Sequence, residues 1–170
     1  LARLKRENGQ GVLMYVDPHY WQTWGALLPC IQTGDTAVHH AFGTANTFDH
    51  HAQDHAFGAV FNAAMTAFSS LNVPAVVGSY DFSASRHVVD VGGGHGRLIG
   101  AVLKANPALR GTLFDLPRVV VGAPAVLAEA GVSDRCTILG GDMFAAVPAG
   151  ADLYLLSHII HDWEDDKAVA

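Results

Sequence analysis

Apolar residues in the first part of the chain recur with the spacing of amphipathic helices. Asp17 followed by Pro18 predicts a helix N-terminus, and Gly34 predicts its end. Pro29 is expected to kink this helix. The apolar stripe between these limits is expected to face a core, and it consists of Trp21, Trp24, Leu27, Leu28 and Ile31.

A second amphipathic helix is predicted after Asp54, which is placed to cap its N-terminus. Its apolar positions are also expected to be core rather than cofactor or substrate contacts, and they are Phe57, Val60, Phe61, Ala64, Met65 and Phe68. The longest uncharged stretch, residues 55–80, is interrupted by polar residues, proline and glycine. It is therefore a poor candidate for a membrane span, and we expect no membrane partner.

The pattern changes near residue 80 to alternating strands and helices. We therefore expect a helical region over residues 1–80 and an α/β domain over residues 81–170, with a parallel sheet covered on both faces. The predicted strands are His87–Val91, Gly111–Phe114, Cys136–Leu139 and Asp152–Ser157. Arg97–Ala105 is predicted to be a helix and Leu116–Ala130 a loop and a helix, and Asp162–Ala170 is predicted to start another helix.

Composition and charge exclude several classes of protein. The net charge is −6 and there is no basic patch, which argues against a nucleic-acid partner. Half of the residues are hydrophobic, enough for a folded core. Cys30 and Cys136 are too far apart in sequence to suggest a disulfide framework, and no signal peptide is visible. We expect a reducing, cytoplasmic location.

The strongest chemical signal is the glycine turn Asp90-Val-Gly92-Gly-Gly94-His-Gly96, which follows a predicted strand and opens a helix. Glycines allow the backbone to approach a ligand and leave amide groups pointing at it. A dinucleotide fingerprint would need a further glycine at position 97 or 99, where Arg97 and Ile99 stand. A nicotinamide-dependent reductase is therefore disfavoured.

Three further motifs follow the later strands. Asp115 ends the second strand, where an acid can accept hydrogen bonds from ribose hydroxyls. Asp142 and Met143 follow the third strand and suit an adenine, through a carboxylate acceptor and an apolar thioether. His158 and His161 follow the fourth strand, and a neutral histidine at this edge is a candidate general base.

Taken together, DVGGGHGRL, LFDLP, GGDMF and LLSHIIHDWEDDKAV occur in an order and spacing that resemble the S-adenosylmethionine-dependent O-methyltransferases of the plant caffeate and hydroxyindole type, with their bacterial natural-product relatives. The resemblance covers roughly residues 20–170. It implies a Rossmann-like class I methyltransferase domain preceded by a helical dimerisation region. It also implies a homodimer, a small aromatic substrate with a phenolic hydroxyl, and a reaction without a metal.

The resemblance also implies a role for each motif. The glycine turn, with Gly92 and Gly94, would hold the methionine part of S-adenosylmethionine. Asp115 would bind the ribose, and the adenine would lie among Leu116, Asp142 and Met143. His161 would deprotonate the substrate hydroxyl as the catalytic base, and His158 would contact the cofactor.

The sequence departs from the family pattern at several points. A Lys or Arg usually stands where this chain has Ser157 or His158. Relatives also carry an N-terminal winged-helix region and further strands with an acid that orients the base, so we expect this chain to be part of a longer protein. Asp162 is an alternative orienting acid. A non-catalytic cofactor-binding or partner-binding module remains the rival function.

A histidine-rich segment spans residues 39–55. His51 and His55 have the spacing to share a metal on a helix. A solvated or subunit-contact segment is the expected alternative, because the resemblance implies a metal-independent reaction.

Overall fold

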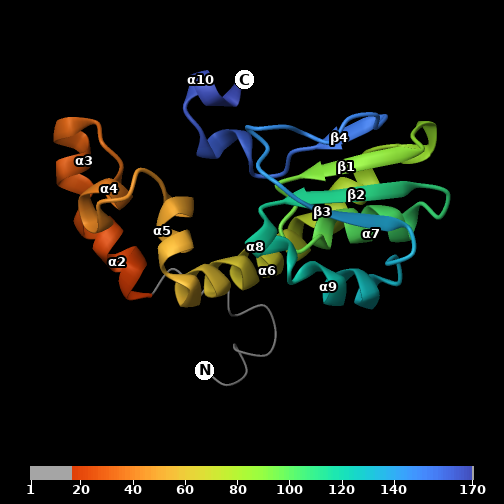
Figure 1. Cartoon of the computed structure of the whole chain (residues 1–170), viewed down its shortest axis with the longest axis horizontal. Helices are drawn as coiled ribbons and strands as arrows, with labels where there is room; N and C mark the ends of the chain where they lie inside the picture. The colour runs from red at the N-terminus through yellow and green to blue at the C-terminus, as the bar shows by residue number, and fades with distance from the viewer. Residues whose placement is uncertain (1–16, 170) are drawn as a thin grey trace. The chain divides into compact units, whose positions relative to one another are not determined.

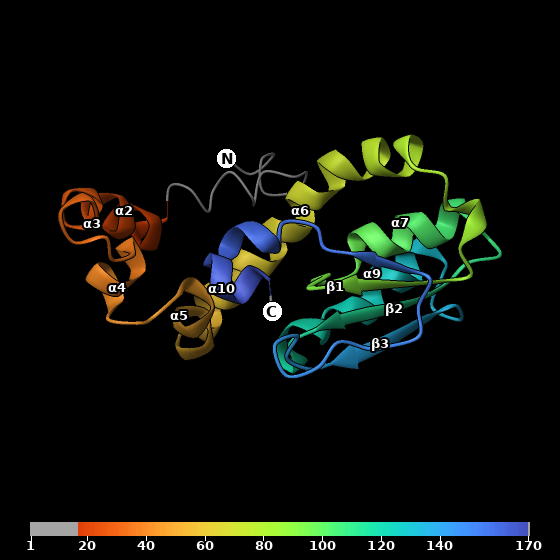
Figure 2. The same cartoon turned by 90° about the horizontal axis from the view of Figure 1, so that it is seen from above.

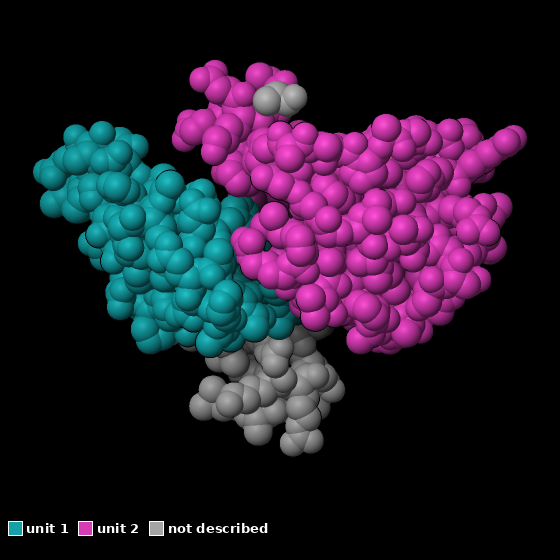
Figure 3. All heavy atoms as spheres, viewed as in Figure 1, with its two compact units in different colours: residues 1–68 teal, residues 69–170 magenta. Residues whose placement is uncertain are grey.

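The structure is a computed structural model that describes residues 17–169 (Figure 1). The chain divides into two compact units, residues 1–68 and residues 69–170, which are coloured separately in Figure 3. The division falls inside the long helix α6 (His55–Ser79), and the predicted boundary at residue 80 marks the end of this helix.

Unit 1 consists of short helices joined by capped turns. They are α2 (Pro18–Gly25), α3 (Leu27–Thr33), α4 (Ala37–Phe42), α5 (Thr47–Gln53) and the first turns of α6. The predicted caps are confirmed, since Asp17 accepts from the His19 amide, Asp54 accepts from the Phe57 amide and Gly34 closes α3 with a φ of 82°. The predicted single kinked helix is instead two helices that separate at Ala26, because Pro29 has no N–H to donate one turn back.

The prediction that the first apolar stripe is core is wrong. Trp21 is 65% exposed, Trp24 63% and Ile31 73%, and Leu27 and Leu28 are also exposed. Neither α2 nor α3 buries any residue, because no described element of unit 1 covers this stripe. Unit 1 therefore presents an apolar face on α2 and α3.

Helix α6 is only partly buried. Phe57 and Ala64 are buried as predicted, but Val60 is exposed. By length and composition alone α6 could cross a membrane. Its last turns nevertheless pack on the core of unit 2 through Val73 and Val76.

Unit 2 contains a four-stranded parallel sheet in the order β3-β2-β1-β4 (Figure 1). Its strands are β1 (His87–Val91), β2 (Arg110–Asp115), β3 (Cys136–Gly140) and β4 (Leu153–Leu155). β1 and β2 are the two inner strands, and in β1 Val88 pairs with Gly111 on one side and Leu153 on the other. β4 is shorter than the predicted Asp152–Ser157, because only three of its residues pair with β1.

The predicted strand and helix alternation is confirmed. Helix α7 (Arg97–Ala105) has the predicted bounds, whereas Leu116–Ala130 forms α8 (Pro117–Val120) and α9 (Ala123–Ala130). The expected C-terminal helix is shorter, and consists of the 3₁₀ turn η2 (Ile160–Asp162) and α10 (Asp165–Ala168). A second 3₁₀ turn, η1 (Phe82–Ala84), precedes β1.

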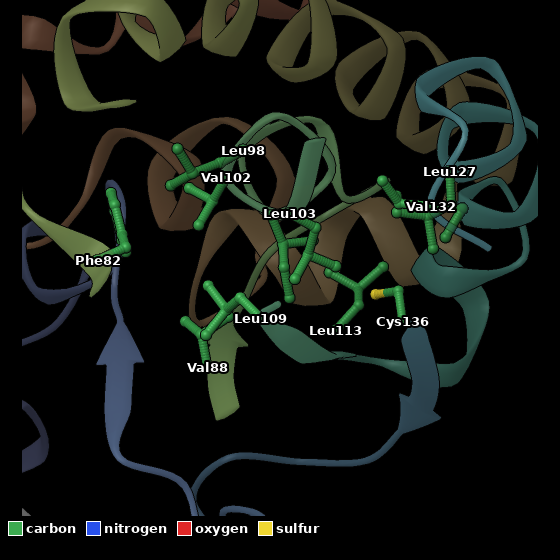
Figure 4. Packing of buried hydrophobic residues seen from close by; sticks show 12 residues of the cluster. Phe82, Val88, Leu98, Val102, Leu103, Leu109, Leu113, Leu127, Val132 and Cys136 are labelled. Carbon is green, nitrogen blue, oxygen red and sulfur yellow. The ribbon is translucent and has the colours of Figure 1, made fainter. Parts of the chain in front are cut away.

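The main core lies between one face of the sheet and helices α7 and α9 (Figures 2 and 4). It includes Leu103 and Ile99 from α7, Leu127 from α9 and Leu113 from β2, each at most 1% exposed. The other face carries a smaller cluster of Val89, Val91 and Phe114 with Met143 and Ala151 packed on it. The helices α7 and α9 thus fix the sheet from one side.

The strand order creates a switch point at β1. The chain leaves β1 for β2 on one side and later returns to β4 on the other. The loops that follow β1 and β4 therefore diverge from adjacent strand ends. In open parallel sheets, ligands bind in the crevice at such a point, beyond the carboxyl ends of the strands.

Candidate active site at the carboxyl edge of the sheet

Each strand of the sheet ends in one of the predicted motifs. The strand order β3-β2-β1-β4 places them side by side along one edge. In that order the motifs are Asp142 and Met143, Asp115 and Leu116, Gly92 and Gly94, and His158 and His161. Residues that lie far apart in the sequence are thereby brought to one edge by backbone pairing alone.

The glycine turn depends on three consecutive residues that lack a side chain. Gly92 and Gly94 have φ values of 65° and 61°, in the left-handed region that favours glycine. At Gly93, which lies between them, a Cβ would stand 2.7 Å from Cγ of Asp90. Only glycine fits this turn, and the backbone is open to a ligand at Gly94, where nothing lies within 4 Å of the position that a Cβ would take.

Asp115 ties the glycine turn to the end of β2. Its Oδ2 accepts from the Gly94 amide at 2.7 Å, and its Oδ1 accepts from the Leu116 amide at 2.6 Å. Burial raises the pKa of Asp115, while the amides of Gly94 and Leu116 oppose that shift. Each carboxylate oxygen has two lone pairs, so the side chain retains capacity to accept from ligand hydroxyls.

Asp90 is a buried acid beneath the same turn. It is 1% exposed, and among the described residues 17–169 neither of its carboxyl oxygens makes a hydrogen bond of good geometry. Burial raises the pKa of Asp90 to about 7, with a further contribution from the charge of Asp115 and an opposing one from the Ile99 amide. The turn therefore rests on a carboxyl group that favours its neutral form.

The loop after β3 is held by a side-chain hydrogen bond and by apolar packing. Asp142 is exposed, and its Oδ1 accepts from the Phe144 amide at 2.9 Å, which stabilises the turn. Met143 is half-buried and packs on the cluster of Val89 and Phe114. Both residues lie at the site edge, together with the half-buried Leu116.

His158 and His161 lie close to one another after β4. Their ring centroids are 5.4 Å apart. The His161 side chain is 63% exposed, and its Nε2 lies 3.4 Å from Oδ1 of Asp162. This separation is longer than a good hydrogen bond, so Asp162 contacts the ring without fixing it. Burial raises the pKa of Asp162, and the charges of His161 and His158 oppose that shift.

Two contacts in this region were not predicted. Ile159 packs on the glycine turn at Gly92. Trp163 meets Phe144 edge to face at 4.6 Å between centroids, with the Lys167 ammonium 5.3 Å from the Trp163 ring. No spacing rule links Phe144 with Trp163, so only the fold reveals this cluster.

Two histidines of the histidine-rich segment, His50 and His51, pack against aromatic side chains. His51 is 6% exposed and lies 4.3 Å from Phe61 between ring centroids, so the expectation of a solvated segment is wrong for this residue. His50 stacks on Phe42 at 4.0 Å, and burial lowers the pKa of His50. Over residues 17–169, no three His, Cys, Asp or Glu side chains are grouped so as to hold a metal ion.

A parallel sheet with a glycine turn after β1 and an acid at the end of β2 defines an α/β domain that binds a nucleoside-containing cofactor. Comparison with known families gives the particular class. A family model of the O-methyltransferase domain matches residues 24–170, and the chain belongs to this family.

Individual relatives agree with this assignment. A phenazine O-methyltransferase of Lysobacter antibioticus is 42% identical over 157 residues, which cover 92% of this chain and 46% of the relative. A mitomycin biosynthesis 6-O-methyltransferase of Streptomyces lavendulae is 42% identical over 152 residues, covering 89% of this chain and 43% of the relative. The chain thus spans less than half the length of these relatives.

Solved structures share the fold. A mitomycin 7-O-methyltransferase superimposes with a TM-score of 0.89 at 39% identity, covering 95% of this chain and 47% of that one. An O-methyltransferase of neocarzinostatin biosynthesis was solved with S-adenosylhomocysteine and 1,4-dihydroxy-2-naphthoic acid. It gives a TM-score of 0.77 at 34% identity, covering 95% of this chain and 46% of that one.

The buried acid predicts a pH-dependent stability. The ordinary pKa of Asp is 3.8 and that of folded Asp90 is about 7, so between these values the folded state holds a proton that the unfolded state releases. This contribution to the free energy of unfolding therefore falls as the pH rises from about 4 to 7, by an amount on the order of a few kcal/mol, and is level above that. Asp90→Asn should lack this fall.

The measurement is urea unfolding of the full-length, cofactor-free protein and its Asp90→Asn variant at a series of pH values. We expect the difference in free energy of unfolding, wild type minus variant, to decrease across this range. Parallel curves would show that Asp90 is ionised in the folded protein.

Proposed function

We propose that the full-length protein is an S-adenosylmethionine-dependent O-methyltransferase acting on a phenolic hydroxyl of a small aromatic natural product. The observation that carries this proposal is the juxtaposition at the switch point. The glycine turn after β1, Asp115 after β2 and the His161 segment after β4 share one edge. The names of the relatives, which act on phenazine and mitomycin compounds, support the substrate class.

The residues at the edge suit the proposed cofactor. The glycine turn is open at Gly94, where nothing lies within 4 Å of a Cβ position, and Asp115 offers acceptor capacity for the ribose hydroxyls. We assign apolar contacts with the adenine to Leu116 and Met143, a carboxylate acceptor beside it to Asp142, and a further cofactor contact to His158. When bound, S-adenosylmethionine supplies the electrophilic methyl group.

His161 is the proposed general base. Its ring is exposed at the same edge, so a substrate hydroxyl can reach Nε2 or Nδ1. In water the pKa of a phenol is about 10 and that of a histidine about 6.5, so the transfer of the proton is uphill. A positive charge near the reacting oxygen favours the phenolate and narrows that gap. His161 then needs only to accept the proton while the hydroxyl is held in line.

Two rival functions make different predictions. A binding module derived from this family would hold the cofactor without turnover. A nicotinamide-dependent reductase is disfavoured, because Arg97 and Ile99 stand where the dinucleotide fingerprint would need a further glycine. Calorimetric titration with S-adenosylhomocysteine and with NAD(P), followed by an assay over a panel of phenols, separates these functions.

The cofactor assignment predicts that Asp115→Ala weakens the binding of S-adenosylhomocysteine. Each charge-assisted hydrogen bond lost from the ribose should cost roughly 1.5–3 kcal/mol. Calorimetric titration of the full-length protein checks this, with Asp134→Ala, the loss of an exposed acid in the same unit, as the matched control. Unchanged affinity in a folded Asp115→Ala protein would remove the ribose assignment.

The base assignment predicts that His161→Ala lowers kcat by roughly 10²- to 10⁴-fold while cofactor affinity holds, because general-base catalysis contributes about that much. Raising the pH should partly restore activity, since free phenolate replaces the missing base. His158→Ala should instead mainly weaken cofactor binding. Wild-type turnover in His161→Ala, or no gain in its rate as the pH is raised by about 2 units, would exclude this role.

We also propose that the protein is a cytoplasmic homodimer that pairs through the helical region. The exposed apolar face on α2 and α3 supports this, because a contiguous apolar surface commonly marks an interface. Light scattering of the full-length protein at micromolar concentration should give twice the monomer mass. The double change Trp24→Glu and Ile31→Glu should reduce the mass, whereas Val121→Glu, at an exposed position in unit 2, should not. A monomeric wild type would contradict the proposal.

A further inference from the structure

The segment that carries His161 is fastened directly to the glycine turn. Ile159 lies over Gly92, where a Cβ built on the glycine would overlap the Cδ1 of Ile159 and stand 3.1 Å from its Cγ1. The side chain of Ile159 is therefore seated in the space that Gly92 leaves by lacking a side chain. Gly92 thus serves two purposes, since its φ of 65° forms the turn and its bare Cα receives Ile159.

The backbone at His158 makes this contact possible. His158 has a φ of 57°, and it is the sole non-glycine residue with positive φ in the part of the chain that the structure describes. This conformation is costly for an L residue other than Asn or Asp, and it persists where surrounding contacts enforce it. The chain bends at Ser157 and His158, two and three residues beyond the end of β4, and the next residue, Ile159, packs on the turn after β1.

A second contact holds the other side of the segment. Trp163 meets Phe144 of the loop after β3. The Lys167 ammonium lies within 6 Å of both rings, at 5.3 Å from Trp163 and 5.8 Å from Phe144. In the sequence, His161 thus lies between two residues that hold the segment: Ile159, which packs on the glycine turn, and Trp163, which packs on the loop after β3.

The ring of His161 is itself only loosely held. It is 63% exposed, and its approach to Asp162 is 3.4 Å. Because side-chain contacts do not fix the ring, its position relative to the cofactor motifs depends on where the backbone segment is attached. The attachment nearest to the glycine turn is Ile159.

We infer that Ile159 is a positioning residue: by packing on Gly92 it holds the segment after β4 against the glycine turn and so sets the location of His161. The left-handed backbone conformation of His158 supports this contact. This inference rests on the proposed function, since it assigns to Ile159 a part in presenting the base. An apolar side chain is suited to this role because it competes with neither the substrate nor the cofactor for hydrogen bonds.

The test compares two adjacent isoleucines. Ile159→Ala removes the seated side chain, whereas Ile160→Ala removes one that is 57% exposed. In the full-length enzyme, with the phenol it turns over best, Ile159→Ala should lower kcat about 10- to 100-fold with a smaller change in KM, because a displacement of about 1 Å at a catalytic group has effects of this size. Ile160→Ala should stay within about twofold of wild type.

A double-variant cycle separates positioning from a general loss of structure. If Ile159 acts through His161, adding Ile159→Ala to His161→Ala should lower kcat little further, because the group being positioned is already absent. Fully additive losses, or equal effects of Ile159→Ala and Ile160→Ala in folded proteins, would overturn the inference.

A spectroscopic readout keeps this test independent of the proposed function. If the wild type turned over no phenol, the proposed function would fail. The positioning role would still be measurable as a shift of the His161 ring resonances in Ile159→Ala but not in Ile160→Ala. Unshifted resonances in both variants would contradict the role of Ile159.

A matched pair of variants tests the backbone conformation of His158. His158→Gly and His158→Ala both remove the ring, but only glycine adopts the left-handed conformation without penalty. His158→Ala should therefore be the less active of the two, by roughly 5-fold. Equal activities would show that the backbone conformation of His158 does not position the segment.

Discussion

The site depends on the parallel pairing of β1 with β2 on one side and β4 on the other. This pairing places Asp90 level with Leu113 and with Leu155, so the three strands end at nearly the same height. The glycine turn, Asp115 and the histidine segment then follow within a few residues. No single motif creates the site, because each contributes one or two groups that act only when the backbone brings them to the same edge.

The electrostatic character of this edge follows from two acids beneath one turn. Asp90 is buried and Asp115 is half-buried, and the charge of Asp115 adds to the rise in the pKa of Asp90. The two carboxyl groups are not equivalent, since Asp115 accepts two backbone amides and Asp90 has no such pair among residues 17–169. A positively charged ligand at the turn would stabilise the ionised form of both. The arrangement is therefore suited to a cationic cofactor rather than to an anionic one.

Much of this arrangement could be predicted from the sequence, because strands and turns carry local signals. Buried apolar runs such as residues 87–91, and the glycines that follow them, reflect constraints within a few residues. The contacts of Ile159 and Trp163 could not be predicted, since each joins segments through the sheet register. Trp21 and Trp24 were predicted to be core residues and are exposed. A stripe at helical spacing shows that a face is apolar, but not what covers it.

The exposure of His161 places a demand on the rest of the active enzyme. Methyl transfer to oxygen requires that water be excluded from the nucleophile, yet the described residues leave 63% of this side chain open. Within the proposed function, the cover has to come from the substrate, from other parts of the full-length protein or from a second copy. An aromatic substrate is suited to this purpose, because its own ring shields the hydroxyl once it lies against the edge. Rigid attachment of the segment at Ile159 and Trp163 then matters more, since a base that is open to solvent has few side-chain neighbours to hold it in place.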